Sequence, residues 1–404
     1  MPRRLLLLLS ENPLDPANGA ARSVDSICRL LAREGGYDVE ALGTTATELA
    51  DAGAMAKQKT TVLTGMGLQV ERVTINDASI LKFERDKVRY TLLDTGSIRL
   101  DQPHSIHGPR FDAIYRRTLD RFKPDVVLTF GAMPVELERR REARGRGIAV
   151  VLSIHQHAYY SRGAFKTADA VHTCSEYLRK CYLERIGIDS VALSGPIMPE
   201  DVVAPDHDPV FATFVNPSYE KGVMFMARLA EELAMRRPDI PMLVIETRFN
   251  AGTLIAAGDA GGFDLRRHES LMAAPAVQSP RDIFASMRLL LAPSLWDEPW
   301  GRVAAEALMN GIPPMVSDRG GLAEACNGGG YVFAMPPEMQ PQTQAPPEKE
   351  VVMPWVEAIE RLCDDESAYA EARKRAIEAA AIHQPQSVLP GFLSFFDSIR
   401  CKAK

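Results

Sequence analysis

Short apolar runs alternate with helix-like periodicity through the first half of the chain. The earliest run is residues 5–9, all leucine, and a polar turn separates it from a helical stripe formed by Val24, Ile27, Cys28 and Leu31. Similar runs follow at residues 125–130, 148–154, 170–174 and 191–195. Uninterrupted apolar runs are typical of strands in a parallel sheet that is covered on both faces. The pattern predicts an α/β domain with a doubly wound sheet.

The same alternation restarts in the second half, after a break. Residues 195–209 are rich in proline and acidic side chains and show no periodicity, which is typical of a linker. New apolar runs follow at residues 211–216, 241–246, 289–294, 313–318 and 330–333. We therefore expect two Rossmann-like doubly wound domains. Their predicted limits are residues 1–198 and 210–380, with a hinge at 199–209 and a final helix at 381–404 that can pack on the N-terminal domain.

Composition favours a two-domain protein of the cytoplasm. The chain has 404 residues, and single cores rarely exceed about 250–300 residues. Its formal charge of −6 argues against nucleic acid as a partner. Six scattered cysteines without a CxxC pair indicate reduced thiols, and the leucine run is shorter than the ~7–15 residues of a signal-peptide core.

Arginines concentrate in two segments of the predicted N-terminal domain, residues 115–123 and 139–146. Such segments are usually solvated helix faces, and glutamates interrupt the second one. The alternative is attraction to anionic lipid, which would place the protein at the inner face of a membrane as a peripheral protein. No apolar stretch approaches the ~20 residues of a membrane span.

The stretch "SLWDEPWGRVAAEALMNG", residues 294–311, carries the strongest chemical signal. We expect a helix that begins at Pro299 or Trp300, whose first amides and dipole suit a phosphate or diphosphate. Gly301 would let the backbone approach that group closely. Glu298 and Glu306 should not contact an anion, but they can accept hydrogen bonds from hydroxyl groups at either end of it. A sugar nucleotide has both the diphosphate and the hydroxyls.

These residues resemble the donor-binding signature of a known family. The E-x7-E element of Glu298 and Glu306, followed by "DRGGLAE", resembles that of the retaining GT-B glycosyltransferases of family 4. Residues 168–188 and 214–233 resemble two further segments of these enzymes. The resemblance implies the GT-B fold, an α/β architecture in which two Rossmann-like domains face each other across a cleft. It also implies an N-terminal acceptor-side domain, a C-terminal nucleotide-sugar domain, and transfer that retains the anomeric configuration.

The resemblance also implies roles for individual residues. Glu306 would hold the ribose hydroxyls, Glu298 the transferred sugar, and Lys221 the charge of the diphosphate. The backbone around the helix start would bind the diphosphate and sugar, through Trp300, Gly301, Arg302 and Val303. His155, at the end of a predicted strand, aligns with a histidine that contacts donor sugar or acceptor. His155, Glu298 and Lys221 are therefore the candidate catalytic residues.

The chain departs from the family pattern at two places. Asn216 stands where an arginine commonly binds phosphate, so Arg248 or Arg302 would have to substitute for it. A single glycine, Gly19, stands where a glycine pair is usual, so close approach of that turn to the diphosphate rests on one residue. We expect base recognition at residues 276–279, which include Val277.

We predict no metal site and no cofactor apart from a donor of UDP or GDP type. The H-x-H pair His155 and His157 lacks a carboxylate or thiol partner, and the D-x-D match at residues 206–208 falls in the predicted hinge. The helix amides and Lys221 would neutralise the departing diphosphate without a metal.

Other functions remain open at this point. A nucleotide-sugar epimerase of the same fold would need acid and base residues but no acceptor, and a noncatalytic sugar-nucleotide-binding partner would bind donor without turnover. A dehydrogenase would need G-x-G-x-x-G after the first strand, whereas the segment there, "ANGAARS", has one glycine. The sequence does not identify the base, the sugar, the oligomeric state, or whether the acceptor is a glycan, a lipid-linked sugar or a small molecule.

Overall fold

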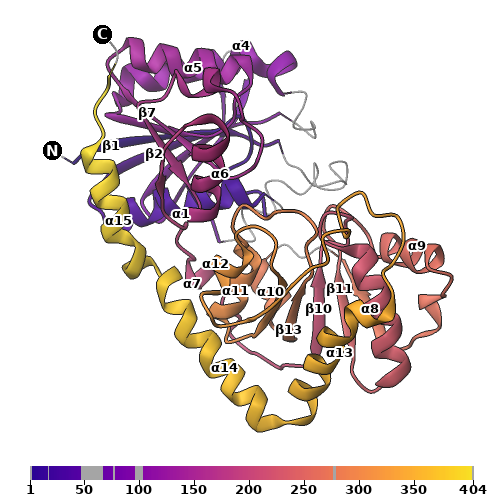
Figure 1. Ribbon diagram of the computed structural model, residues 1–404. Helices are drawn as coiled ribbons and strands as arrows, with labels where there is room; N and C mark the ends of the chain where they lie inside the picture. Colours follow the sequence, from indigo (N-terminus) through magenta and orange to yellow (C-terminus); the bar gives the residue numbers. More distant parts are fainter. Residues whose placement is uncertain are drawn as a thin grey trace. The chain divides into compact units, whose positions relative to one another are not determined.

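The computed structural model describes residues 2–16, 18–46, 67–75, 78–95, 103–275 and 279–402 (Figure 1). The chain divides into two compact units. The N-unit comprises Met1–Pro196 together with Pro385–Lys404, and the C-unit comprises Ile197–Gln384. The segment that we expected to be a linker falls in the C-unit and contains a short helix, α7 (Pro199–Val202).

The N-unit is built on one sheet. Its described strands are β1 (Arg4–Leu8), β2 (Asp38–Thr44), β3 (Glu71–Ile75), β4 (Ala78–Arg85), β5 (Val88–Leu93), β6 (Val126–Thr129), β7 (Ala149–Ile154), β8 (Ala170–Thr173) and β9 (Val191–Ala192). They lie in the order β3-β4-β5-β2-β1-β6-β7-β8-β9. The pairs β3–β4 and β4–β5 are antiparallel, and the other pairs are parallel.

Helices cover both faces of this sheet (Figure 1). The described helical segments are α1 (Gly19–Arg33), α4 (Pro103–Phe122), α5 (Pro134–Gly145), η1 (Arg162–Phe165), α6 (Glu176–Ile186) and α15 (Pro385–Ser398). Successive residues of a strand point to opposite faces. Leu5 and Leu7 therefore pack with α1 and α15, while Leu6 and Leu8 pack with α4 and α5. The leucine run is thus a central strand buried on both faces, as predicted.

The C-unit is also built on one sheet. Its described strands are β10 (Phe211–Val215), β11 (Met242–Ile245), β12 (Leu271–Ala274), β13 (Met287–Ala292), β14 (Pro314–Ser317) and β15 (Tyr331–Phe333). Their order is β12-β11-β10-β13-β14-β15, and every pair is parallel. This is the 3-2-1-4-5-6 order of the Rossmann fold, in which ligands bind where the order reverses. Here the reversal lies between β10 and β13.

The helices of the C-unit bury one face of this sheet against a large apolar core. The described helical segments besides α7 are α8 (Val223–Arg236), α9 (Gly252–Ala260), η2 (Leu265–Arg267), α10 (Pro280–Phe284), α11 (Arg302–Met309), α12 (Leu322–Cys326), α13 (Lys349–Asp364), α14 (Glu366–Ala380) and η3 (Ala381–His383). Trp355 of α13 stacks on Phe333 of β15, with ring centroids 4.6 Å apart, and meets Phe225 of α8 edge-on. None of the described helices is long and apolar enough to cross a membrane.

Candidate functional site

The loops that follow β10 and β13 meet at the switch point of the C-unit. These strands are neighbours, and Phe214 lies opposite Leu291 near their carboxyl ends. The carbonyl of Glu220, in the first loop, accepts hydrogen bonds from the backbone amides of Leu295 and Trp296 in the second, at 2.9 and 3.1 Å. The two loops therefore form one connected surface at the position where a ligand is expected.

Gly222 allows this close approach. It caps α8 with a φ of +88°, and a Cβ added there would lie 2.0 Å from the carbonyl oxygen of Pro293. No side chain can be accommodated at that distance, and the left-handed conformation itself disfavours any residue with a Cβ. The glycine thus brings the N-terminus of α8 against the loop after β13.

Two of the predicted catalytic residues meet at this junction. The Lys221 ammonium lies 2.5 Å from Oε1 of Glu298, and the hydroxyl of Ser294 lies 2.8 Å from the same oxygen. Lys221 is partly exposed, whereas Glu298 is largely buried. A cation and a hydrogen-bond acceptor are thus held side by side at the carboxyl edge of the sheet. Ser294 was not identified from the sequence, because serine beside a strand end carries no distinctive pattern.

The helix that follows begins later than predicted. Helix α11 starts at Arg302, with Gly301 as its N-cap at a φ of +128°, so the prediction of a start at Pro299 or Trp300 is wrong. Glu298 instead forms a parallel bridge with Gly320, and its carbonyl accepts the amide of Gly321 at 2.7 Å. Because a Cβ at Gly320 would lie 2.3 Å from the Glu298 carbonyl oxygen, the first glycine of "DRGG" is what permits this contact.

The side chain of Trp300 packs inside the C-unit and does not line the surface where a ligand is expected. It is buried, and its ring meets that of His383 edge-on at 5.4 Å. Burial lowers the pKa of His383, and its Nε2 hydrogen-bonds to the carbonyl of Ala325 at 2.8 Å. Trp300 therefore fixes the entry to α11, while the amides of Arg302 and Val303 occupy the first helical turn, where amides lack intrahelical acceptors.

Glu306 and Arg302 form an ion pair on α11. Nε of Arg302 lies 2.8 Å from Oε1 of Glu306, one helical turn away, and the Glu306 side chain is only 4% exposed. The buried carboxylate is thereby compensated, as buried charges must be. Arg302 was one alternative for the missing phosphate cation, and its guanidinium is paired with Glu306.

Asn216 occupies a constrained position directly after β10. Its φ is +62°, and Oδ1 of its side chain is buried without a hydrogen-bond partner among the described residues. The amide oxygen and nitrogen can be interchanged by rotation, so the same point offers an acceptor or a donor. Arg248 lies exposed in the loop after β11. Val277, predicted near the base, lies outside the described residues.

In the N-unit, His155 directly follows β7 and its Nε2 lies 2.7 Å from the hydroxyl of Ser153. His157 turns to Tyr160, whose hydroxyl lies 2.6 Å from its Nδ1. Gly19 is the first residue of α1, and a Cβ there would meet nothing within 4 Å. Local packing therefore does not require glycine at position 19, and its donor-binding role stays a prediction.

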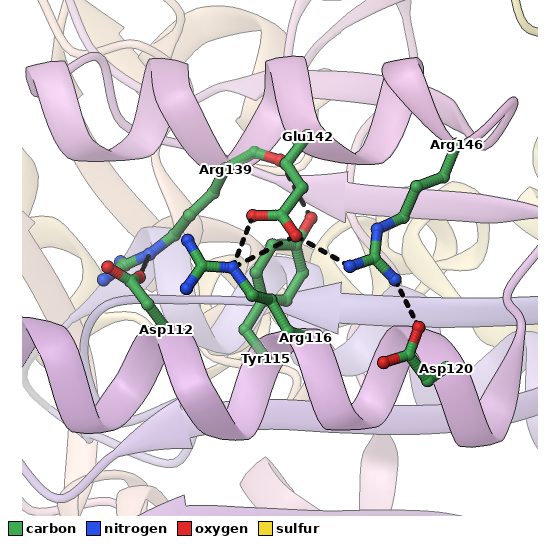
Figure 2. A network of polar contacts seen from close by, with 7 residues as sticks. All are labelled: Asp112, Tyr115, Arg116, Asp120, Arg139, Glu142 and Arg146. Carbon is green, nitrogen blue, oxygen red and sulfur yellow. Dashed lines mark hydrogen bonds and ion pairs between the residues drawn. The ribbon is translucent and has the colours of Figure 1, made fainter.

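The arginine-rich helices α4 and α5 are joined by ion pairs, as Figure 2 shows. The pairs between them are Arg139–Asp112 at 2.7 Å, Arg116–Glu142 at 3.1 Å and Arg146–Asp120 at 2.6 Å. Arg146, the C-cap of α5, also pairs with Glu142 of the same helix at 2.8 Å. Much of the positive charge that the sequence places here is therefore neutralised locally, which weakens the basis for attraction to anionic lipid.

Arg140, next to these pairs, is fully buried. Its guanidinium donates to the carbonyls of Gly131 and Ala164 at 2.7 and 3.2 Å and to the hydroxyl of Thr167 at 2.9 Å. Burial lowers its pKa to about 10. This side chain therefore ties α5 to the loops after β6 and β7 and is not available to a lipid surface.

Within the part of the chain that the structure describes, no three His, Cys, Asp or Glu side chains are grouped as ligands for a metal ion. In the D-x-D match, His207 Nε2 hydrogen-bonds to the carbonyl of Met287 at 2.8 Å. The histidine thus joins this segment to the beginning of β13.

Comparison with known proteins identifies the fold. Residues 17–194 match the model of Glycosyltransferase Family 4. A search of curated protein sequences gave no significant match. Among solved structures, HepE of Anabaena in complex with UDP and glucose has a TM-score of 0.66 at 13% identity and covers 98% of this chain and 99% of its own.

Two further structures show the same similarity. Sucrose-phosphate synthase from Thermosynechococcus elongatus has a TM-score of 0.66 at 14% identity, with 98% of each chain covered. The catalytic domain of starch synthase IV from Arabidopsis thaliana, bound to ADP and acarbose, has a TM-score of 0.61 at 11% identity and covers 98% of this chain and all of its own. The predicted fold class is confirmed. The chain has the GT-B fold, and its residues 17–194 are similar to glycosyltransferase family 4.

Proposed function

We propose that the protein is a hexosyltransferase that moves a sugar from a nucleoside-diphosphate sugar to an acceptor hydroxyl with retention of configuration. The observation that carries this proposal is the pairing of Lys221 with Glu298 at the switch point of the C-unit, with Glu306 on the helix that follows. A cation for phosphate and two carboxylates for hydroxyl groups are the complement of a sugar nucleotide.

The donor would rearrange the ion pair. In the structure, Lys221 and Glu298 neutralise each other. A sugar hydroxyl would donate to Glu298 in place of the ammonium, and Lys221 would turn to the diphosphate together with the amides at the start of α11. Glu306 would accept the ribose hydroxyls, because it is a buried carboxylate on the same helix. Asn216 Oδ1 or Nδ2 would meet a polar group of the donor.

Leaving-group stabilisation would supply most of the catalysis. Negative charge develops on the departing phosphate oxygen, and donors that are already oriented stabilise it without reorganisation. Lys221 and the helix amides provide such donors, so we propose chemistry that needs no metal. The N-unit would hold the acceptor, with His155 near the reacting hydroxyl. We propose a UDP or GDP donor, which is supported by the HepE structures, described as complexes with UDP and with UDP-glucose.

The test is release of nucleoside diphosphate from UDP-, GDP- and ADP-sugars, with and without a panel of glycan, lipid-linked and small-molecule acceptors. Glu306→Gln should raise the donor KM at least about tenfold, since each lost hydroxyl contact to a charged group is worth about 1.5–3 kcal/mol. Glu371→Gln removes an exposed carboxylate of α14 and serves as the matched control.

Three results would contradict the proposal. A product with inverted anomeric configuration would exclude the retaining mechanism. Free epimerised nucleotide sugar would identify an epimerase. Donor binding without turnover against every acceptor would indicate a noncatalytic binding partner.

A further inference from the structure

A chain of hydrogen bonds runs through the N-unit and ends at His155. Ser153 of β7 and His172 of β8 lie opposite each other in the register of the sheet. The Ser153 hydroxyl lies 2.7 Å from Nδ1 of His172 and 2.7 Å from Nε2 of His155. Nε2 of His172 lies 2.8 Å from the carbonyl oxygen of Leu193. Three side chains and one carbonyl are thus connected in series.

The interior part of this series of hydrogen bonds is buried. Ser153 is fully buried and His172 is 1% exposed. Phe392 and Phe395 of α15 lie against the His172 ring, with centroid distances of 5.7 and 6.2 Å. Burial lowers the pKa of His172 to about 4, against the opposing effect of the Leu193 carbonyl. His172 is therefore neutral at physiological pH, so only one of its ring nitrogens carries a proton.

This neutrality fixes the direction of every hydrogen bond. A carbonyl can only accept, so the His172 proton is on Nε2 and its Nδ1 is a bare acceptor. The Ser153 hydroxyl must donate its single proton to that Nδ1. The same oxygen can then only accept from His155, whose Nε2 must therefore carry a proton.

We infer that Ser153 and His172 are positioning residues that keep the proton of His155 on Nε2, so that the ring, when neutral, is held as the tautomer whose Nδ1 is a hydrogen-bond acceptor. The substrate that this acceptor serves rests on the proposed function. With an acceptor sugar, Nδ1 would receive a hydrogen bond from the attacking hydroxyl and align it. The opposite tautomer would offer a donor, which orients a hydroxyl with its proton pointing the wrong way.

Nitrogen NMR of the histidine side chains tests this directly in the full-length protein. In the wild type, at a pH where the His155 ring is neutral, His155 should show a protonated Nε2 and an unprotonated Nδ1 without averaging. In His172→Phe, the Ser153 hydroxyl loses its acceptor and can donate to His155, so a population with protonated Nδ1 should appear. Ser153→Ala tests the same link if His172→Phe does not fold, and it should give a mixture of tautomers.

Matched variants separate this role from a general structural one. Ser153→Thr keeps the hydroxyl and should keep the wild-type tautomer. Ser190→Ala removes a hydroxyl that hydrogen-bonds to Thr173, which lies on β8 beside His172 but is not part of the series of hydrogen bonds. This variant should also leave the tautomer of His155 unchanged. Wild-type His155 with protonated Nδ1, or an unaltered pure Nε2–H tautomer in both His172→Phe and Ser153→Ala, would overturn the inference.

Kinetics distinguish this inference from the proposed function. Ser153→Ala should lower kcat about tenfold with an unchanged donor KM, and Ser153→Thr should restore it. If the wild type turns over no donor while its NMR spectra match the prediction, the proposed function fails and the positioning roles stand. If turnover is normal but kcat is equal in Ser153→Ala and wild type, the tautomer has no catalytic role and that part of the inference is wrong.

Discussion

Mild acid should destabilise the N-unit through His172. Its pKa is lowered from about 6.5 to about 4 by burial, so the unfolded chain binds a proton at higher pH than the folded chain does. Between these values the unfolded state holds more protons, and the free energy of unfolding therefore rises with pH. The full stability is present above about pH 6.5 and is lost progressively as the pH falls toward about 4.

The size of the effect follows from the same two values. From about pH 7 to about pH 5, protonation of this one histidine in the unfolded state should lower the free energy of unfolding by about 2 kcal/mol. Replacing His172 with Phe removes the group that titrates. The variant has its own packing cost, but its stability should depend less on pH than that of the wild type by the same ~2 kcal/mol.

The assay must report on the N-unit alone. All three tryptophans, Trp296, Trp300 and Trp355, lie in the C-unit, so tryptophan fluorescence would miss the transition. Hydrogen exchange of peptides covering β7 and β8, corrected for the intrinsic pH dependence, follows opening of the N-unit. Parallel pH dependence in wild type and His172→Phe, or a His172 that titrates near its usual pKa, would refute the reasoning.

Four further predictions concern the loops and the reaction. Gly222→Ala should lower the calorimetric affinity for nucleotide at least about tenfold, because the added Cβ has no room beside Pro293. Gly262→Ala is the control, since Gly262 has a similar φ but open space around it. This variant should lose about 1–2 kcal/mol of stability and keep its affinity for nucleotide. Lys221→Met should weaken binding of a nucleoside diphosphate about tenfold and that of the free nucleoside hardly at all; equal losses would contradict the diphosphate role. EDTA should leave the rate of transfer unchanged, and restoration of a lost rate by Mg²⁺ would contradict the metal-free chemistry. Arg140→Met should lower the free energy of unfolding by about 3 kcal/mol in urea titrations, because three acceptors lose their donor, and a neutral effect would show that water replaces the guanidinium.

The strands that the sequence predicted are those whose burial can be read from their own apolar residues. The leucines of residues 5–9 form a central strand because an uninterrupted apolar run fits a sheet covered on both faces. Strand β2 was missed because Glu40 interrupts it. That carboxylate is buried and accepts hydrogen bonds from Arg89 of β5 and Arg121 of α4, at 3.2 and 2.9 Å. Its compensation comes from residues about 50 and 80 positions away, which no local pattern shows.

The candidate site likewise combines residues that the sequence indicates with contacts that only the folded chain creates. Glu298 and Glu306 became candidates because the spacing of acids around a predicted helix start after a strand is readable along the chain, and Lys221 became one through the family resemblance of its segment. The start of α11 was misplaced, because the bridge between Glu298 and Gly320 depends on a contact between separate loops. The pairing of Ser153 with His172 depends in turn on strand register, which becomes visible only when the sheet is assembled.

Thermal unfolding in the presence of nucleotides tests the central claim that the C-unit binds a nucleoside-diphosphate sugar. UDP, GDP, ADP, TDP and CMP would be compared on the wild type and on Glu306→Gln, with and without Mg²⁺. A ligand at about 100 times its Kd stabilises the native state by about 2.7 kcal/mol, which corresponds to a rise of a few degrees in Tm. We predict a rise with one diphosphate, independent of Mg²⁺ and lost in Glu306→Gln. The absence of a rise with every nucleotide, or an equal rise in the variant, would contradict the claim.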